Sequence, residues 1–186
     1  MQKDTIIYPY NILFTPILRH IKLNDQYNIV AAILPGSWYK EGIDASFIDD
    51  SETIGVPLLH NFELQVENCN TILWADYDYS GNNKFYNKVV EQMWQALCNK
   101  KNIICCQKLN DAEIRKFSHL AKLNDVEFKY ITDNIKYEKK EKYSDRISVP
   151  IITVMGIAEN CSKFEMQLVL RRVFHRKGYK ISQIGS

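Results

Sequence analysis

The sequence predicts an α/β fold, in which a mainly parallel β-sheet carries helices on both of its faces. Short apolar runs, which are typical of buried strands, alternate along the chain with longer segments of helical periodicity. Strands that are separated by helices pair in parallel through right-handed crossovers. Residues 1–135 contain most of these segments and are therefore predicted to form a Rossmann-like α/β domain.

Five apolar runs in this domain are predicted strands. The second run, YNIVAAIL, is continuous, which is typical of a strand that is buried on both faces of a sheet, and Pro35-Gly36 ends it. The predicted strands are Thr5–Tyr8, Tyr27–Leu34, Thr71–Ala75, Asn102–Cys106 and Glu127–Ile131.

Three helices are predicted between these strands. Thr15 and Pro16 suit the N-cap and first position of a short helix. Apolar residues recur at helical spacing from Phe85 to Leu97, and a third helix is predicted over Asp111–Leu123, started by Asn110 or Asp111. Residues 37–59 are predicted to be a loop, and a connection of this length is often functional.

Composition excludes several classes of protein. The 186 residues are 46% hydrophobic and 12% aromatic, which is enough for a core and excludes global disorder. A formal net charge of +2 gives no argument for binding nucleic acid or a membrane surface, and no apolar run reaches the length of about 18 residues that spans a bilayer. Five irregularly spaced cysteines without a CxxC pattern predict buried thiols in a cytoplasmic protein and no metal site.

A second unit is predicted after a charged linker. Residues 136–146 (KYEKKEKYSDR) lack aliphatic side chains and are predicted to be solvated. Residues 147–186 are predicted to form a β-α-β unit: a strand over Val149–Met155, a helix that Gly178 ends, and a strand over Lys180–Ile184. This order of elements resembles the start of a P-loop domain. The loop at Gly156–Lys163 would lie between the strand and the helix, where a P-loop domain has its phosphate-binding loop.

The loop departs from the phosphate-binding pattern GxxxxGK[ST]. When Gly156 is aligned with the first glycine, Cys161, Ser162 and Lys163 occupy the glycine, lysine and hydroxyl positions, and none matches. A shift by one residue makes Lys163 the lysine of a loop that is one residue too long. Three interpretations stay open: a site for a nucleotide with magnesium at Gly156, Ser162 and Lys163, a degenerate remnant of such a site, or a unit that keeps only the shape.

Three further loops follow predicted strands, at the edge where open α/β sheets bind ligands. Asp76 and Asp78 could ligate magnesium or exchange protons, although such residues more often cap turns. No Ser–His–Asp or Cys–His set is apparent, so no catalytic residue is predicted and enzymatic activity stays open. The candidate ligand-binding residues in these loops are Tyr10, Asn11, Ser37, Trp38, Asp76 and Asp78.

The segments YPYNILFTPILRH, AAILPGSWYKEGIDA, ILWAD and VMGIAENCSKFEMQLVLRRVFHRKGYKISQIGS resemble the peptide maturation system proteins of bacterial natural-product gene clusters. The resemblance implies an accessory protein that binds a precursor peptide or a radical SAM enzyme, and it supplies no catalytic residue. The alternative function is a P-loop-like NTPase or its remnant. Because a P-loop domain needs further strands, a chain ending at Ser186 is expected to be truncated or to pack its last strands on the larger unit or a partner.

Overall fold

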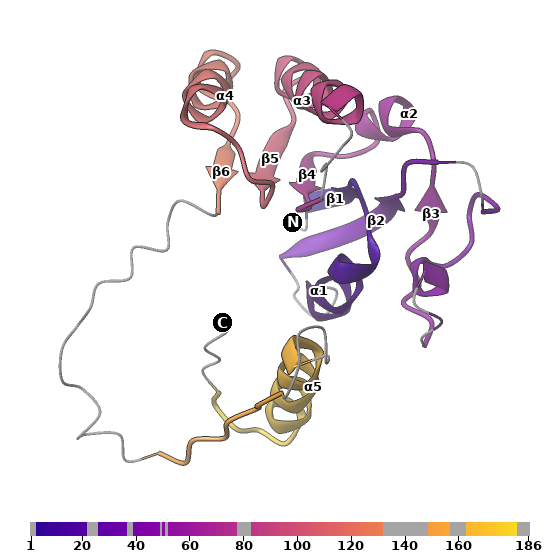
Figure 1. The fold of residues 1–186 in the computed structure, drawn as a ribbon, viewed down its shortest axis with the longest axis vertical. Coiled ribbons are helices and arrows are strands. Elements are labelled where there is room, and N and C mark those ends of the chain that lie inside the picture. The colour runs from indigo at the N-terminus through magenta and orange to yellow at the C-terminus, as the bar shows by residue number, and fades with distance from the viewer. Residues whose placement is uncertain are drawn as a thin grey trace. The chain divides into compact units, whose positions relative to one another are not determined.

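The computed structural model describes residues 3–21, 26–36, 39–48, 50, 52–77, 83–131, 149–156 and 163–181. Contacts within the chain divide it into two compact units, Met1–Lys136 and Tyr137–Ser186. Figure 1 shows the first unit as a sheet with helices and the second as a helix with its flanking segments.

The first unit is built on a six-stranded sheet whose strand pairs are all parallel. The order across the sheet is β3-β2-β1-β4-β5-β6, which is the order of the doubly wound Rossmann fold. The prediction of a mainly parallel Rossmann-like sheet is therefore confirmed. The strands are β1 (Lys3–Tyr8), β2 (Tyr27–Ile33), β3 (Leu58–Leu59), β4 (Thr71–Trp74), β5 (Asn102–Cys105) and β6 (Phe128–Tyr130).

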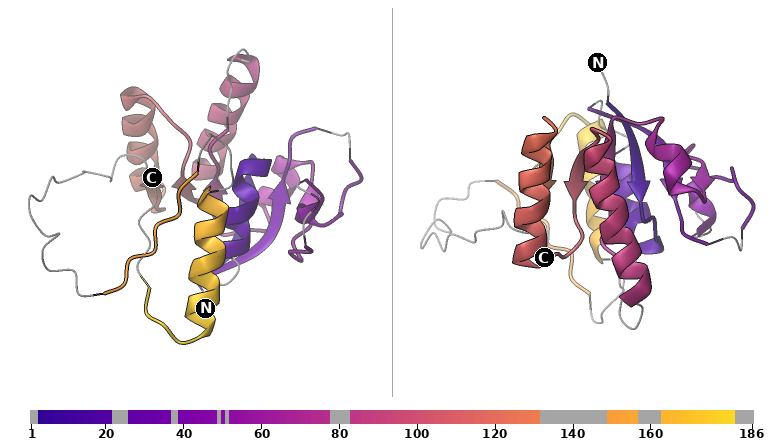
Figure 2. Two further views of the ribbon diagram at one scale, coloured as in Figure 1. Left: turned by 60° about the horizontal axis from the view of Figure 1, so that its bottom comes forward. Right: turned by 90° about the horizontal axis from the view of Figure 1, so that it is seen from above.

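Helices cover both faces of this sheet, as predicted. One face carries α2 (Phe62–Val66), α3 (Asn83–Cys98) and α4 (Asp111–Leu123), and the other carries α1 (Thr15–Ile21) (Figure 1, Figure 2). Alternate strand residues feed two separate cores: Tyr8 and Trp74 pack beneath α2 and α3, while Leu73 packs on the α1 side.

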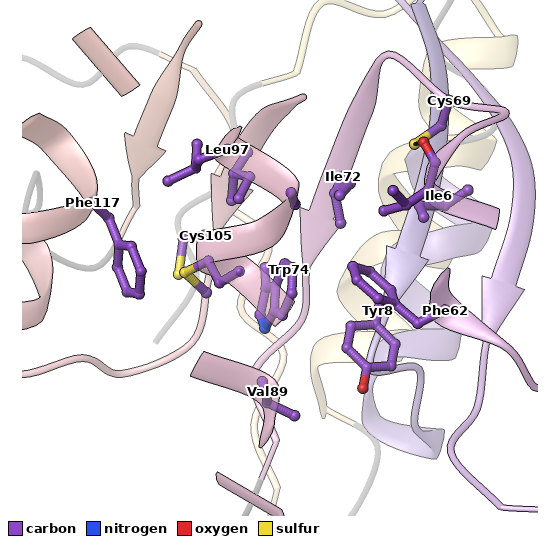
Figure 3. Close-up of a cluster of buried hydrophobic side chains, with 14 of the residues drawn as sticks. Ile6, Tyr8, Phe62, Cys69, Ile72, Trp74, Val89, Leu97, Cys105 and Phe117 are labelled. Atoms are coloured by element: carbon purple, nitrogen blue, oxygen red, sulfur yellow. Dashed lines mark hydrogen bonds between the residues drawn. The ribbon is translucent and has the colours of Figure 1, made fainter. Parts of the chain in front are cut away.

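Aromatic side chains fill the core beneath α2 and α3 (Figure 3). Trp74 is fully buried, and its ring meets those of Tyr8 and Phe62 edge-on at centroid distances of 5.2 and 5.5 Å. The Tyr8 hydroxyl donates a hydrogen bond of 2.6 Å to Gln92 Oε1, and Gln92 Nε2 donates one of 2.7 Å to Glu63 Oε1. This polar chain links β1 to α3 and α2.

The region predicted as a loop over residues 37–59 contains more structure than expected. It includes the 3₁₀ helix Ala45–Ile48, a bridge from Asp44 to Pro57 and the short strand β3. The Asp44 carboxylate accepts hydrogen bonds from four main-chain N–H groups, those of Ser46, Ile54, Gly55 and Val56. One side chain therefore organises this connection.

The second unit differs from the predicted β-α-β arrangement. Its helix α5 (Lys163–Arg176) confirms the predicted helix, and Gly178 at φ 85° ends it by donating to the His175 carbonyl. The strand predicted over Val149–Met155 is wrong, because residues 149–156 have no regular structure. A β-branched apolar run forms a strand only beside a partner strand, and the described part of the chain supplies none, so Ile151 stays 69% exposed.

The closing strand predicted at Lys180–Ile184 is not formed at Lys180 and Ile181, and its other residues lie outside the described part. Among the residues that the structure describes, no helix has both the length and the apolar character that a membrane span requires.

Candidate functional site

The site lies where the direction of strand order reverses. The chain moves outward from β1 to β2 and β3, and then returns to place β4 on the other side of β1. In open α/β sheets, ligands bind at this point, beyond the carboxyl ends of the two strands that flank it. The loop after β1 and the loop after β4 therefore position the candidate site.

Tyr10 anchors the loop after β1. Its side chain is fully buried in the core on the α1 side, and its hydroxyl donates a hydrogen bond of 2.8 Å to Thr15 Oγ1. Its main-chain N–H donates to the Ile33 carbonyl at 2.7 Å, which holds the loop against the end of β2. The predicted ligand-binding residue Tyr10 is thus a structural anchor here.

Asn11 and Asp76, two predicted site residues, are brought together. Asn11 Nδ2 donates a hydrogen bond of 2.8 Å to the main-chain carbonyl of Asp76, which joins the loops after β1 and β4. Asn11 Oδ1 is buried and has no hydrogen-bond partner in the described part of the chain. A buried acceptor without a donor is rare in folded proteins and calls for an explanation.

A pocket of about 300 Å³ opens beside this bridge, on the α1 side of the sheet. Its walls are almost entirely apolar. Two of its lining residues are exposed to solvent: Leu13 has 76% of its surface accessible and Ile131 has 38%. The lining consists of Asn11, Leu13, Phe14, Ile17, Ile21, Leu73, Asp76, Cys106 and Ile131.

The charge of the pocket comes from Asp76. Burial and, to a smaller extent, the nearby Asp76 carboxylate raise the pKa of the Cys106 thiol to about 11. Burial also raises the pKa of Cys105 to about 12, with smaller contributions from Cys106 and Asp76. Both thiols are therefore protonated at neutral pH, and neither is an activated nucleophile.

The remaining predicted site residues lie in the second unit or outside the described residues. Gly156 lies in the irregular segment of the second unit, and Lys163 is the first residue of α5. Ser37, Trp38, Asp78 and Ser162 lie outside the described residues. Within the described ranges, no group of three or more His, Cys, Asp or Glu side chains is arranged to hold a metal ion.

Most of the lining was missed at the sequence level. Ile17, Ile21 and Leu73 have the pattern of core residues, so periodicity assigns them to packing. Cys106 and Ile131 directly follow β5 and β6, and that position is the one available signal for residues at the carboxyl edge.

The loop after β1 lacks the feature that binds pyrophosphate in dinucleotide-binding folds. That feature is a G-x-G-x-x-G turn, which brings main-chain N–H groups and a helix N-terminus to the phosphates. The segment between Tyr8 and Thr15 reads PYNILF and contains no glycine. The N–H groups of Tyr10 and Phe14 are already bonded to the carbonyls of Ile33 and Asn11.

No protein-family model matches the chain, and no curated protein matches it. Among solved structures, it is similar to homoserine dehydrogenase from S. aureus. The structure at pH 6.0 has 18% identity and a TM-score of 0.50, over 69% of this chain and 33% of that chain. The structure at pH 7.0 has 15% identity and a TM-score of 0.52, over 69% and 32%. This chain aligns with about a third of the dehydrogenase, and the likeness shows the fold alone.

Proposed function

We propose that this chain is a non-catalytic accessory protein of ribosomal-peptide maturation and that its Rossmann-like unit binds a peptide at the carboxyl edge of the sheet. The observation that carries the proposal is the apolar pocket beside the β1–β4 switch point. Side chains that would otherwise be core residues are open there to an incoming apolar group. The resemblance of the sequence to peptide maturation system proteins names the class of ligand.

Binding is favoured over catalysis by the chemistry of the lining. A covalent mechanism needs a nucleophile beside a general base, and general acid–base catalysis needs a proton carrier within hydrogen-bond reach of the substrate. The only ionisable side chains in the described lining are Asp76 and Cys106, and burial keeps Cys106 protonated. The pocket therefore suits recognition of a ligand that another protein modifies.

The test is binding of a ribosomally made precursor peptide, measured by isothermal titration calorimetry. Ile17→Trp fills the pocket from α1, and we expect it to weaken binding by about tenfold or more, which is about 1.4 kcal/mol. Leu64→Trp adds the same side chain at an exposed position on α2, across the sheet, and serves as the matched control.

Melting temperatures of both variants show whether the fold is kept. Absence of peptide binding to the wild type, or equal binding by folded Ile17→Trp, would contradict the proposal. If the chain binds a radical SAM enzyme in the same assay but does not bind the peptide, its partner is the modifying enzyme and not the peptide.

Nucleotide binding is the second candidate, and three observations favour it. The strand order is that of dinucleotide-binding sheets, and similar solved structures include a dehydrogenase. Lys163 also stands at the first turn of α5, where a phosphate loop would place its lysine.

Calorimetry with NADH, ATP and GTP, with and without magnesium, tests this candidate. Binding that Lys163→Ala abolishes would assign a nucleotide site to the second unit. Binding that this variant leaves unchanged would assign the site to the Rossmann-like unit, and no heat with any of the three would leave peptide binding as the function.

A further inference from the structure

The Asp76 carboxylate is the one charged group in the described lining of the pocket. Asn11 Nδ2 donates one of its two N–H groups to the Asp76 carbonyl, and Asn11 Oδ1 is buried, so this oxygen is not open to an occupant. Asp76 adds a carboxylate, which accepts only. No lysine, arginine or histidine belongs to the described lining.

This arrangement selects the charge of the occupant. A phosphate or carboxylate group would be repelled by the Asp76 carboxylate, and no cationic side chain of the described lining would offset that repulsion. A positively charged N–H donor is complementary, because it would pair with the Asp76 carboxylate. The rest of the occupant must be apolar, since Phe14, Ile17 and Leu73 form the walls.

The size and rim of the pocket indicate how the occupant continues. A volume of about 300 Å³ lies at the lower end of the range for small-molecule pockets, so it suits one large side chain. Leu13 and Ile131 remain exposed at the lining, and Ile12 next to Leu13 is 53% exposed. An occupant that extends beyond the pocket would cover this apolar rim, whereas a small amine would leave it in water.

We propose that the pocket binds the first residue of a peptide, with its apolar side chain between Ile17 and Leu73 and its free α-ammonium group beside the Asp76 carboxylate. This inference rests on the proposed function, and it names the part of the peptide that is recognised. A peptide with an N-terminal ammonium and a large apolar first side chain is the ligand class. Recognition in this form selects a free, already exposed N-terminus over an internal segment.

The probes are three short peptide amides: one that begins with phenylalanine, the same peptide with an acetylated N-terminus, and one that begins with serine. Each is titrated into the full ¹⁵N-labelled chain, and the dissociation constant is taken from the shifts of the Asn11 side-chain amide and its neighbours. We expect acetylation, and separately the change to serine, to weaken binding by about tenfold or more. Phenethylamine is titrated in parallel as the small-amine alternative.

Asp76→Asn is the informative variant, because the Asp76 main chain, not its side chain, accepts the bond from Asn11. It should bind the free and acetylated peptides with nearly equal, weak affinity. Asp125→Asn removes the same charge from the turn before β6, where φ is 57° and asparagine is readily accommodated, so it should retain the preference.

The results separate this inference from the proposed function. Equal binding of free and acetylated peptides to the wild type would overturn the inference while leaving peptide binding intact. If phenethylamine binds as tightly as the peptide, the inference that the bound ammonium group belongs to a peptide would be wrong, and the pocket would be a site for small amines. No binding by any probe, combined with binding of the full precursor peptide, would place recognition elsewhere in the peptide; no binding by the precursor either would remove the proposed function as well.

Discussion

The side-chain amide of Asn11 and the main-chain carbonyl of Asp76, which are 65 residues apart in the chain, are joined by a hydrogen bond of 2.8 Å. Asn11 follows β1 and Asp76 follows β4, so the bond connects the two strand ends that flank the switch point. The bond therefore sets the spacing of the two loops on which the pocket depends.

Replacement of Asn11 by alanine should destabilise the fold by about 1 kcal/mol, because a net intramolecular hydrogen bond contributes about that amount. Urea unfolding measures the change. Asn28→Ala is the control, since Asn28 Nδ2 donates to Asp4 Oδ1 at 2.7 Å in an exposed position at the other end of the strands. If Asn28→Ala lowers the free energy of unfolding as much as Asn11→Ala does, the Asn11–Asp76 hydrogen bond contributes no more to stability than an exposed one.

Asp44 should make stability depend on acid pH. Burial raises the pKa of its carboxyl group, but hydrogen bonds from the main chain and from Ser46 outweigh this effect and lower the pKa to about 2. Because the folded value lies below the ordinary one, the group stabilises the fold above about pH 4 and loses this contribution as the pH falls toward about 2. Solvent screening limits the contribution to about 1 kcal/mol.

Asp44→Asn tests this dependence by thermal unfolding across the acid range. The variant replaces acceptor oxygens by an amide that cannot accept four N–H bonds, so it should melt at a lower temperature at neutral pH. The difference from wild type should narrow as the pH falls below about 4. A constant difference at all pH values would refute the assignment.

Tyr8 and Gln92 should behave as a coupled pair. Burial raises the pKa of the Tyr8 phenol, so the hydroxyl is protonated and donates to Gln92 Oε1 at 2.6 Å. Tyr8→Phe leaves that buried oxygen without its donor and should cost about 1–3 kcal/mol. The double variant with Gln92→Leu should lose less than the sum of the two single losses, by about 0.5 kcal/mol or more in a urea-unfolding cycle.

The cysteines should react in a fixed order with iodoacetamide. Cys98 is exposed, whereas Cys105 is buried, so Cys98 should be alkylated first and Cys105 very slowly. Cys106 should react slowly at neutral pH and faster as the pH approaches the pKa of its thiol, which is about 11. Mass spectrometry of peptic fragments gives each rate, and Asp76→Asn should accelerate Cys106 by lowering its pKa.

A bound peptide should protect Cys106 in the same experiment, because this thiol lies in the pocket lining. Protection of Cys98 to the same extent would point to a general change in the protein instead.

The longer elements of the fold could be predicted because their patterns are local. Asp111–Leu123 is helical over the predicted span, with Asn110 and Glu113 forming a capping box at its start. β3 and α2 could not be predicted, because two and five residues are too few to display a period. The failure at Val149–Met155 has a different origin, since strand formation depends on a neighbour that the local sequence does not describe.

The candidate site was predictable only as separate parts. Loops after strands could be identified, and Asn11 and Asp76 were among their residues. Their contact depends on β4 lying beside β1, and the alternation of strands and helices does not determine strand order. The apolar lining is indistinguishable in sequence from a core, because whether Ile17 faces a neighbour or an opening is decided by tertiary packing.

The outermost strands of the sheet, β3 and β6, have only two and three residues. Such short edge strands expose too few unpaired main-chain N–H and C=O groups for a strand of another molecule to pair with them. Concentrated solutions of the Rossmann-like unit should accordingly resist edge-to-edge stacking into fibrils.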